Sequence, residues 1–188
     1  GVRYMHDEAL VALPDVLHAV GVVRPVLVGH SDGGSIALIH AGAGHAVAGL
    51  VLLAPHVFVE DVSIASIAAA GRAYEETDLR ARLARYHDDV DSAFRGWNDI
   101  WLHPDFRGWN IEAYLPRVAC PVLAIQGEDD EYGTMEQVRR IERQAPDVDV
   151  LALADCRHSP HRDQPEAAID AIVRFVDRLT APPAAPRP

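Results

Sequence analysis

The sequence predicts an α/β fold, in which a parallel sheet carries helices on both faces. Four short apolar runs have the composition of buried strands, at residues 25–29, 49–54, 121–127 and 148–154. Helical patterns alternate with these runs along the chain, and such alternation is typical of a parallel sheet. Ligands bind such sheets outside the carboxyl ends of the strands, so the residues that follow each run are the first candidates for function.

Composition limits the classes of protein that need to be considered. The chain has 188 residues, of which 49% are hydrophobic and 24% charged, as in an ordinary soluble globular domain. A formal charge of −11 argues against nucleic acid and against an anionic membrane as partners. No stretch reaches the roughly 18 apolar residues of a membrane span, and no signal peptide is evident, so we expect a cytoplasmic protein. Cys120 and Cys156 are expected to be buried, reduced thiols.

The first element is a predicted helix over residues 6–20. Its apolar residues recur at helical spacing, and Gly21 is placed to end it. Pro14 lies inside the pattern and should either kink the helix or mark a new first turn.

The stretch V-L-V-G-H-S-D-G-G-S-I-A-L, residues 26–38, predicts a buried strand that turns abruptly into a helix. Ser31 stands at the apex of this turn, in a strained backbone conformation. We expect Gly29 and Gly33 to provide the room that the crowded turn needs. The Ser31 hydroxyl would then project from the sheet edge, and the backbone N–H of Asp32 would face the same point.

Residues 56–116 carry a different pattern, because the strand signals stop and several short helical segments follow one another. All three tryptophans of the chain lie here. Phe94, Trp97 and Trp101 form an apolar stripe on one predicted helix. The stripe is either the core of this helical segment or a wall that faces a substrate.

Two further helices are predicted in the C-terminal part. Thr134 and Gln137 suggest a capping box for a helix that runs to about Arg143. Pro165 opens a predicted amphipathic helix, whose apolar residues are Ile169, Ile172, Val173, Val176 and Leu179. Residues 181–188 are rich in Pro and Ala and are predicted to be a disordered tail.

Three motifs resemble those of the α/β-hydrolase family, and with the stretches between them they cover nearly the whole chain. Residues 25–41 are similar to its nucleophile elbow, residues 121–130 to its acid-bearing strand and turn, and residues 156–161 to its histidine loop. The resemblance implies a core in two parts, residues 1–55 and 117–180. Residues 56–116 would be a helical cap inserted between them.

The family's order of catalytic residues is serine, acid, histidine. It implies that Ser31 is the nucleophile, His158 the general base and Asp130 the carboxylate that orients it. Glu128 and Asp129 are adjacent alternatives for the acid, but the family's Gly-x-x-Asp turn matches Asp130. His161 competes for the role of base, but His158 comes directly after the strand-end loop.

The remaining expectations concern the substrate and other ligands. Candidate substrate-binding residues are His30, His56, Trp97, Trp101 and His161. The histidines show no spacing typical of metal ligands, and no phosphate loop or dinucleotide motif is present, so we expect neither metal nor cofactor. The expected partner is a small-molecule substrate, and a homo-oligomer is possible.

The sequence departs from the family at its start. The complete fold has further strands before the first helix, and a loop among them gives the second donor of the oxyanion hole. Here the Asp32 N–H is the only donor that the motifs provide, and loss of one donor costs about 10²–10³ in rate. We therefore expect an N-terminally truncated hydrolase, whose elbow strand forms an exposed sheet edge.

The leading functional hypothesis is cleavage of an ester or similar acyl bond through a serine acyl-enzyme. The family also contains carbon–carbon bond hydrolases that act on ring-cleavage products. A catalytically incomplete fragment, which binds or assembles without turnover, is a hypothesis from a different class. A cofactorless oxygenase or haloperoxidase-like activity on the same three residues is a third.

Overall fold

The computed structural model describes residues 1–181 and contains a parallel sheet, as the sequence predicts. The strands are β1 (Val26–His30), β2 (Gly49–Leu53), β3 (Val122–Gly127) and β4 (Val148–Leu153), in the spatial order β1-β2-β3-β4. Every residue of β2 and β3 is buried, as expected for central strands that are covered on both faces. The predicted disordered tail lies outside the described residues from 182 onward.

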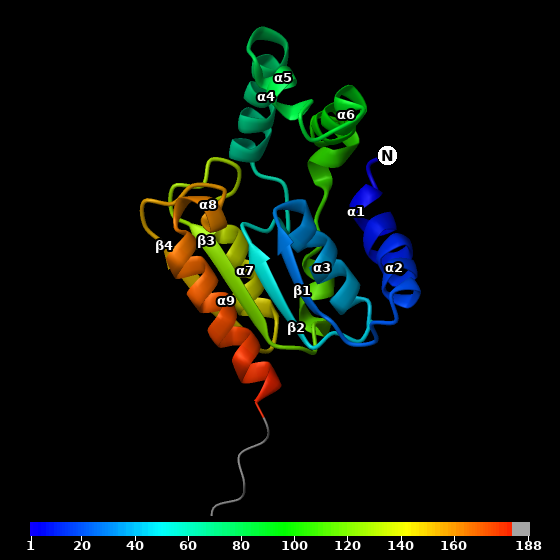
Figure 1. Cartoon of the computed structure of the whole chain (residues 1–188), viewed down its shortest axis with the longest axis vertical. Coiled ribbons are helices and arrows are strands. Elements are labelled where there is room, and N and C mark those ends of the chain that lie inside the picture. The colour runs from blue at the N-terminus through cyan, green and yellow to red at the C-terminus, as the bar shows by residue number, and fades with distance from the viewer. Residues whose placement is uncertain (182–188) are drawn as a thin grey trace, which may run out of the picture.

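Helices cover both faces of the sheet, which confirms the predicted fold class (Figure 1). α3 (Asp32–Gly42) and α7 (Glu136–Gln144) pack on one face, and α9 (Pro165–Thr180) packs on the other. Successive residues of a strand point to opposite faces. Leu50 and Leu52 of β2 therefore join the core under α3, whereas Val51 and Leu53 join the core under α9.

The N-terminal helix is divided as Pro14 predicts. It consists of α1 (Tyr4–Asp7), a π-helical turn η1 (Glu8–Ala12) and α2 (Leu13–Ala19), with Pro14 in the first turn of α2. Pro14 has no N–H to donate to the preceding turn, and the wider π-helical turn lies where the regular hydrogen-bond pattern is interrupted. Gly21 follows with a φ of +72°, a conformation that glycine adopts without strain.

Between β2 and β3 the chain forms α4 (Asp61–Glu76), α5 (Leu79–Leu83), α6 (Val90–Trp101) and the 3₁₀ turns η2 (Pro104–Gly108) and η3 (Glu112–Arg117). We call residues 56–116 the helical insertion. Figure 1 shows α4, α5 and α6 beyond the carboxyl ends of the strands. Tyr74, Val90 and Phe94 form a small core of their own there, whereas Ile111 and Leu115 belong to the main core.

The predicted capping box at α7 is wrong. Thr134 Oγ1 does accept a hydrogen bond from the Glu136 N–H, but the Gln137 side chain turns away from the helix start. Its Oε1 accepts from the Val57 N–H at 2.7 Å, and its Nε2 donates to the Phe58 carbonyl at 3.1 Å. Gln137 therefore satisfies backbone groups of the buried segment that leaves β2, which would otherwise lack partners.

The apolar face predicted for α9 is also partly wrong. Ala168, Ala171 and Phe175 are the residues that the helix buries. Of the predicted residues, Ile169 and Val173 are 53% and 51% exposed. The other three are partly buried and pack against the core under this helix, namely Ile172, Val176 and Leu179. The two alanines are small enough for a close approach to the sheet and Phe175 fills the core, so this stripe sets the orientation of the helix.

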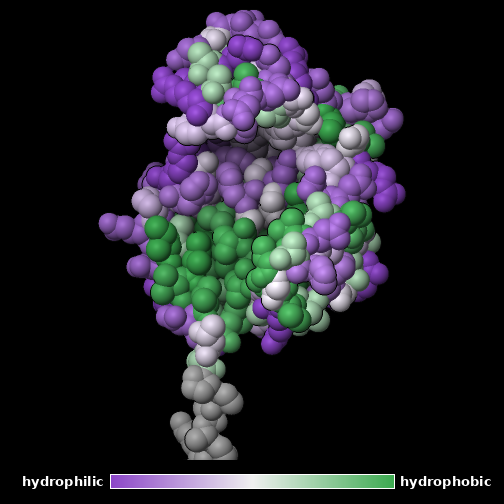
Figure 2. All heavy atoms as spheres, turned by 45° about the vertical axis from the view of Figure 1, so that its right-hand side comes forward, coloured by the Kyte–Doolittle hydropathy of each residue, from purple (hydrophilic) through white to green (hydrophobic). Residues whose placement is uncertain are grey.

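A large hydrophobic area lies on the surface below the helical insertion, and a hollow separates the two (Figure 2). Exposed apolar side chains at or near the edge of the sheet include Val20, Val23 and Val28. Val28 belongs to β1, which is an edge strand, as the sequence predicts. Within residues 1–181, no helix combines the length and the apolar character needed to cross a membrane.

Candidate active site

Ser31 occupies a sharp turn between β1 and α3. Its φ of +55° lies in the left-handed region, which non-glycine residues seldom adopt. The Ser31 N–H donates to the Leu53 carbonyl at 2.8 Å, and the Ser31 carbonyl accepts from the Gly34 N–H at 2.9 Å. The strand thus passes directly into the helix, and the strained residue is held by hydrogen bonds on both sides.

Gly29 and Gly34, and not Gly33, are the glycines that this turn requires. A Cβ on Gly29 would lie 2.3 Å from the Gly33 carbonyl oxygen, and one on Gly34 would lie 3.0 Å from Pro55 Cβ. A Cβ on Gly33 would meet nothing within 4 Å. The expectation that Gly33 provides room is therefore wrong, because its own side-chain position is open and only its carbonyl takes part in the crowding.

The structure brings Ser31, His158 and Asp130 together from three separate loops. His158 Nε2 lies 3.0 Å from Ser31 Oγ. His158 Nδ1 lies 2.9 and 3.0 Å from the two carboxylate oxygens of Asp130. Because an ionised carboxylate can only accept hydrogen bonds, the Nδ1 nitrogen carries the proton. The Nε2 nitrogen is then free to accept the Ser31 hydroxyl proton.

Asp130 is held by further hydrogen bonds and is almost inaccessible, with 1% of its side chain exposed. Its Oδ1 accepts from the Tyr132 N–H at 2.8 Å, and its Oδ2 accepts from Gln126 Nε2 at 2.7 Å. The competing candidates lie elsewhere. Glu128 and Asp129 are exposed, and only their backbone N–H groups bond, to the carbonyls of Leu153 and Cys156.

The loop that carries His158 is tied to the rest of the site by hydrogen bonds from distant residues. His30 Nε2 lies 2.7 Å from the His158 carbonyl oxygen and donates to it, since a carbonyl only accepts. Burial lowers the pKa of His30, which favours the neutral ring. The His158 N–H donates to Glu131 Oε2 at 3.3 Å, and the Arg157 N–H donates to Asp163 Oδ2 at 3.0 Å.

A cavity of about 210 Å³ opens beside Ser31 and His158. Four of the predicted substrate-binding residues line it, namely His30, His56, Trp97 and Trp101. His161 does not, because it is exposed and packs edge-on against His30, with their ring centres 5.0 Å apart. Asp32, Ile67 and Tyr132 complete the lining. Sequence reasoning missed Ile67 and Tyr132, although Tyr132 stands only two residues after Asp130.

Two polar residues of this cavity are His56, which is buried, and Asp32, which is half-buried. Burial lowers the pKa of His56 to about 3, so the ring is neutral, and it packs against Trp101 at a centroid distance of 5.0 Å. Asp32 Oδ2 accepts hydrogen bonds from the Tyr4 hydroxyl and from Trp101 Nε1. Asp32 Oδ1 and His56 Nδ1 are buried and have no partner.

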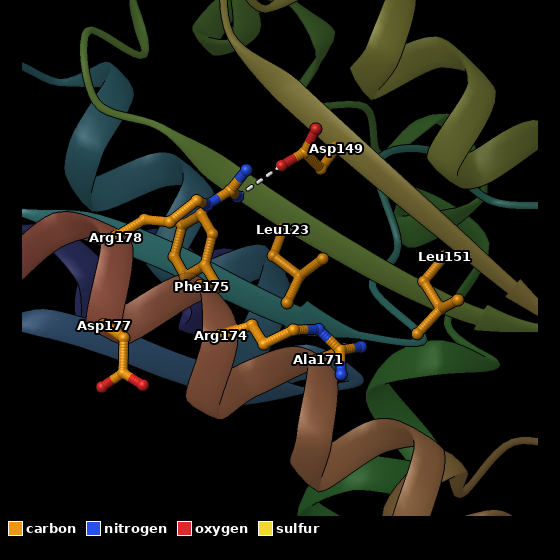
Figure 3. Close-up of a pocket in the computed structure, with 8 residues that line it drawn as sticks. All are labelled: Leu123, Asp149, Leu151, Ala171, Arg174, Phe175, Asp177 and Arg178. Carbon is orange, nitrogen blue, oxygen red and sulfur yellow. Dashed lines mark hydrogen bonds and ion pairs between the residues drawn. The ribbon is translucent and has the colours of Figure 1, made fainter.

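A larger cavity, of about 450 Å³, lies between α9 and strands β3 and β4 and contains none of these residues (Figure 3). Its walls include Leu123, Leu151 and Phe175. Figure 3 shows the Arg178 guanidinium reaching Asp149, an ion pair of 2.5 Å. The lining of this cavity has four charged residues, Asp149, Arg174, Asp177 and Arg178, but no Ser, Cys or His. In the part of the chain that the structure describes, no group of three or more His, Cys, Asp or Glu side chains is arranged to hold a metal ion.

Comparison with known proteins connects this geometry to a family. The model of a family described as "Alpha/beta hydrolase family" matches residues 3–171. No curated protein matches the sequence.

Many solved structures share the fold. The esterase RhEst1 from Rhodococcus sp. ECU1013 is 22% identical, with a TM-score of 0.68 over 95% of this chain and 74% of its own. A thermophilic esterase from Thermogutta terrifontis is 21% identical, with a TM-score of 0.62 over 90% and 71%. The meta-cleavage product hydrolase CumD from Pseudomonas fluorescens IP01 is 16% identical, with a TM-score of 0.65 over 88% and 69%. At these identities the likeness concerns the fold alone.

Proposed function

The chain belongs to the alpha/beta hydrolase family, and from this premise we propose that it is a serine hydrolase that cleaves an ester or related acyl bond of a small molecule. The observation that carries the proposal is the hydrogen-bonded series of Ser31 Oγ, His158 and Asp130, with separations of 3.0 and 2.9 Å. A serine hydroxyl becomes a useful nucleophile when an imidazole takes its proton and a carboxylate orients that imidazole.

In the first half of the reaction, Ser31 Oγ forms a bond to the carbonyl carbon of the substrate while its proton moves to His158 Nε2. Asp130 accepts the Nδ1 hydrogen bond throughout and stabilises the positive charge on the ring. When the tetrahedral intermediate collapses, the bond to the leaving alcohol breaks and His158 gives that alcohol its proton. The acyl group remains on Ser31.

In the second half, a water molecule attacks the acyl-enzyme, and His158 takes a proton from it. Collapse of the second tetrahedral intermediate breaks the bond to Ser31 Oγ, which recovers its proton from His158, and the carboxylic acid leaves. The cavity beside Ser31 would hold the substrate during both halves, with His56, Trp97 and Trp101 among its walls.

The oxyanion of both intermediates needs hydrogen-bond donors. α3 begins at Asp32, and the first N–H groups of a helix have no carbonyl within the helix to bond to. The Asp32 N–H would therefore donate to the oxyanion, and the N-terminus of α3 adds a favourable electrostatic field. A hole with one donor is expected to support a rate about 10²–10³ below that of a complete one.

Turnover of p-nitrophenyl acetate tests this proposal. We expect hydrolysis that falls at least about 10³-fold in Ser31→Ala. Ser159→Ala is the matched control, because Ser159 is a neighbour of His158 outside the proposed triad, and this variant should keep its activity. A fluorophosphonate should label Ser31, as peptide mass spectrometry would show. Equal turnover by Ser31→Ala, or labelling at another residue, would contradict the serine mechanism.

A further inference from the structure

A second apolar cavity, of about 360 Å³, lies among α4, α5 and α6 of the helical insertion, and we call it the insertion cavity. Its walls are apolar and aromatic side chains and one histidine, and they include Ala70, Leu79, Leu83, His87, Val90 and Phe94. Pockets that bind small molecules are typically lined in this way and have volumes from about 300 Å³ upward. The cavity beside Ser31 is smaller, at about 210 Å³.

Trp97 and Tyr132 line both cavities, so these two rings stand between them. Trp97 belongs to α6, and Tyr132 belongs to the loop that carries Asp130. The two ring centres lie 6.5 Å apart at an interplanar angle of 58°, which is within the range for aromatic side chains that pack together. Both residues are half-buried, as expected for a wall with a cavity on each side. We call this pair of rings the aromatic partition.

The aromatic partition is held from both sides. Phe94 packs edge-on against Trp97, with ring centres 5.8 Å apart, and Phe94 belongs to the small core of the insertion. The Tyr132 carbonyl accepts a hydrogen bond from the Ser63 hydroxyl at 2.5 Å, which ties this residue to α4. Displacing either ring would disturb these contacts, so a substrate in the cavity beside Ser31 meets a wall at this point.

The position of Tyr132 indicates which part of an ester would meet this wall. Its ring packs against the His158 ring at a centroid distance of 4.7 Å. In the proposed reaction His158 gives its proton to the leaving alcohol, so the alcohol oxygen must lie within hydrogen-bond reach of Nε2. The carbonyl oxygen is instead drawn toward the Asp32 N–H at the start of α3. The alcohol part of the ester therefore lies nearest to the aromatic partition.

We infer that the aromatic partition limits the size of the alcohol that this site accepts, and that Trp97 is the residue that closes the way to the insertion cavity. The inference rests on the proposed function, because it names the substrate class of the same site, esters of short alcohols. Removal of the indole would join the two cavities. A longer alkyl chain on the alcohol could then leave water for the apolar walls of the insertion cavity.

The test uses three esters, namely ethyl acetate, hexyl acetate and ethyl hexanoate, with acid release followed by titration at constant pH. The last two are isomers that differ in whether the longer chain belongs to the alcohol or to the acid. We expect Trp97→Ala to raise the kcat/KM ratio of hexyl acetate to ethyl acetate at least about 10-fold, because the added methylene groups become buried. The ratio of ethyl hexanoate to ethyl acetate should change less than about 3-fold. Ratios of this kind cancel any general loss of activity.

Two further variants show whether the insertion cavity receives the chain. Ala70 lines the insertion cavity but not the cavity beside Ser31, so in Ala70→Phe/Trp97→Ala the added ring should fill the opened space and reverse most of the rise. Trp97→Leu keeps an apolar side chain in α6 and should raise the same ratio to a lesser extent. A ratio that Trp97→Ala leaves unchanged, an equal rise for ethyl hexanoate, or a rise that Ala70→Phe does not reduce would overturn the inference.

Binding calorimetry with Ser31→Ala separates this inference from the proposed reaction, because it requires no turnover. Hexyl acetate should bind at least about 10-fold more tightly to Ser31→Ala/Trp97→Ala than to Ser31→Ala, whereas ethyl acetate should bind about equally to both. This shift in binding, without any hydrolysis by the unaltered chain, would support the size limit and overturn the hydrolase proposal. Hydrolysis of ethyl acetate with no shift in either measurement would do the reverse.

Discussion

The turn that carries Ser31 and the loop that carries His158 place two side chains 3.0 Å apart, but the chain holds them by different means. The turn is set by the backbone. Three backbone features define it: the positive φ of Ser31, the hydrogen bond from the Ser31 N–H to the Leu53 carbonyl, and the absence of a Cβ on Gly29. Apart from Leu53, the residues that provide these features lie within three positions of each other in the sequence. Among residues 1–181, no side chain hydrogen-bonds the backbone of residues 29–34; the side chains of His30 and Asp32 bond to groups outside the turn.

The histidine loop is set by side chains from elsewhere in the chain. His30, which is 128 residues away in the sequence, donates a hydrogen bond to the His158 carbonyl. Asp130, which is 28 residues away, orients the imidazole ring of His158. Asp163 accepts from the Arg157 N–H. A strained turn encoded locally can be recognised from a short motif, whereas a loop held by distant side chains can be displaced by many single substitutions. The two regions should therefore respond differently to mutation.

The largest expected effect is at the acid that orients the loop's histidine. Asp130→Asn keeps the shape but replaces an acceptor with an amide that favours the wrong tautomer of His158, so kcat should fall about 10⁴-fold. Asp129→Asn is the matched control, because Asp129 is the exposed neighbour whose side chain does not touch the ring. Ester turnover by the two variants measures the difference. Similar losses in both would mean that Asp130 has no special role.

The next largest effect is expected in the turn, on stability. Gly29→Ala would place a methyl group 2.3 Å from the Gly33 carbonyl oxygen, and since both sides of this clash are backbone the turn must distort. We expect a loss of about 3 kcal/mol or more in the free energy of unfolding, measured with urea. Gly33→Ala is the control: its methyl group meets nothing, and alanine in α3 is favoured over glycine by up to about 1 kcal/mol. Equal destabilisation by both substitutions would show that the turn is not held by backbone crowding.

The same contrast explains how much could be predicted from the sequence. Short apolar runs predicted all four strands to within one residue at either end, and the motif around Ser31 predicted a strand, a turn and a helix in the right places. These features depend on neighbouring residues. The pairing of Ser31 with Asp130 and His158, by contrast, was expected only because the motifs resemble those of a family; residue spacing alone left Glu128, Asp129 and His161 as candidates.

Contacts between distant residues are what sequence reasoning missed. Tyr4 hydrogen-bonds Asp32, and Ile67 lines the cavity, yet neither residue stands in a recognisable motif. Gln137 fitted a capping box by its spacing, but the unpaired backbone of residues 57 and 58 took its side chain instead. Local rules fail at such positions because the competing partner lies far along the chain.

A smaller effect is expected from His30, the link between the two regions. His30→Ala removes the hydrogen bond to the His158 carbonyl, and we expect kcat to fall about 10-fold with little change in KM, because the loop is displaced rather than the substrate site. His30→Gln, whose amide can still donate, should recover most of the activity. His161→Ala removes the exposed neighbouring ring and should stay within about two-fold. If both alanine variants behave alike, the bond from His30 does not position the loop.

The smallest expected effect is a loss of stability at acidic pH, because low pH protonates side chains and the site contains the buried side chain of His56. Burial lowers the pKa of His56 to about 3, below its ordinary value of 6.5, so as the pH falls below 6.5 the unfolded chain takes up a proton that the folded chain refuses. The stability that neutral His56 contributes is thus complete above about pH 6.5 and is lost progressively toward pH 3. Between pH 7 and pH 6 this loss amounts to about 0.7 kcal/mol.

His56→Gln removes the titrating group, so urea unfolding at pH 7 and at pH 6 should differ by about 0.7 kcal/mol less than in the unaltered chain. Other buried histidines such as His30 titrate equally in both proteins and cancel in the comparison. The exposed His87, changed to glutamine, should leave the pH dependence as it was. An undiminished pH dependence in His56→Gln would show that His56 is protonated as easily in the folded chain as in the unfolded one.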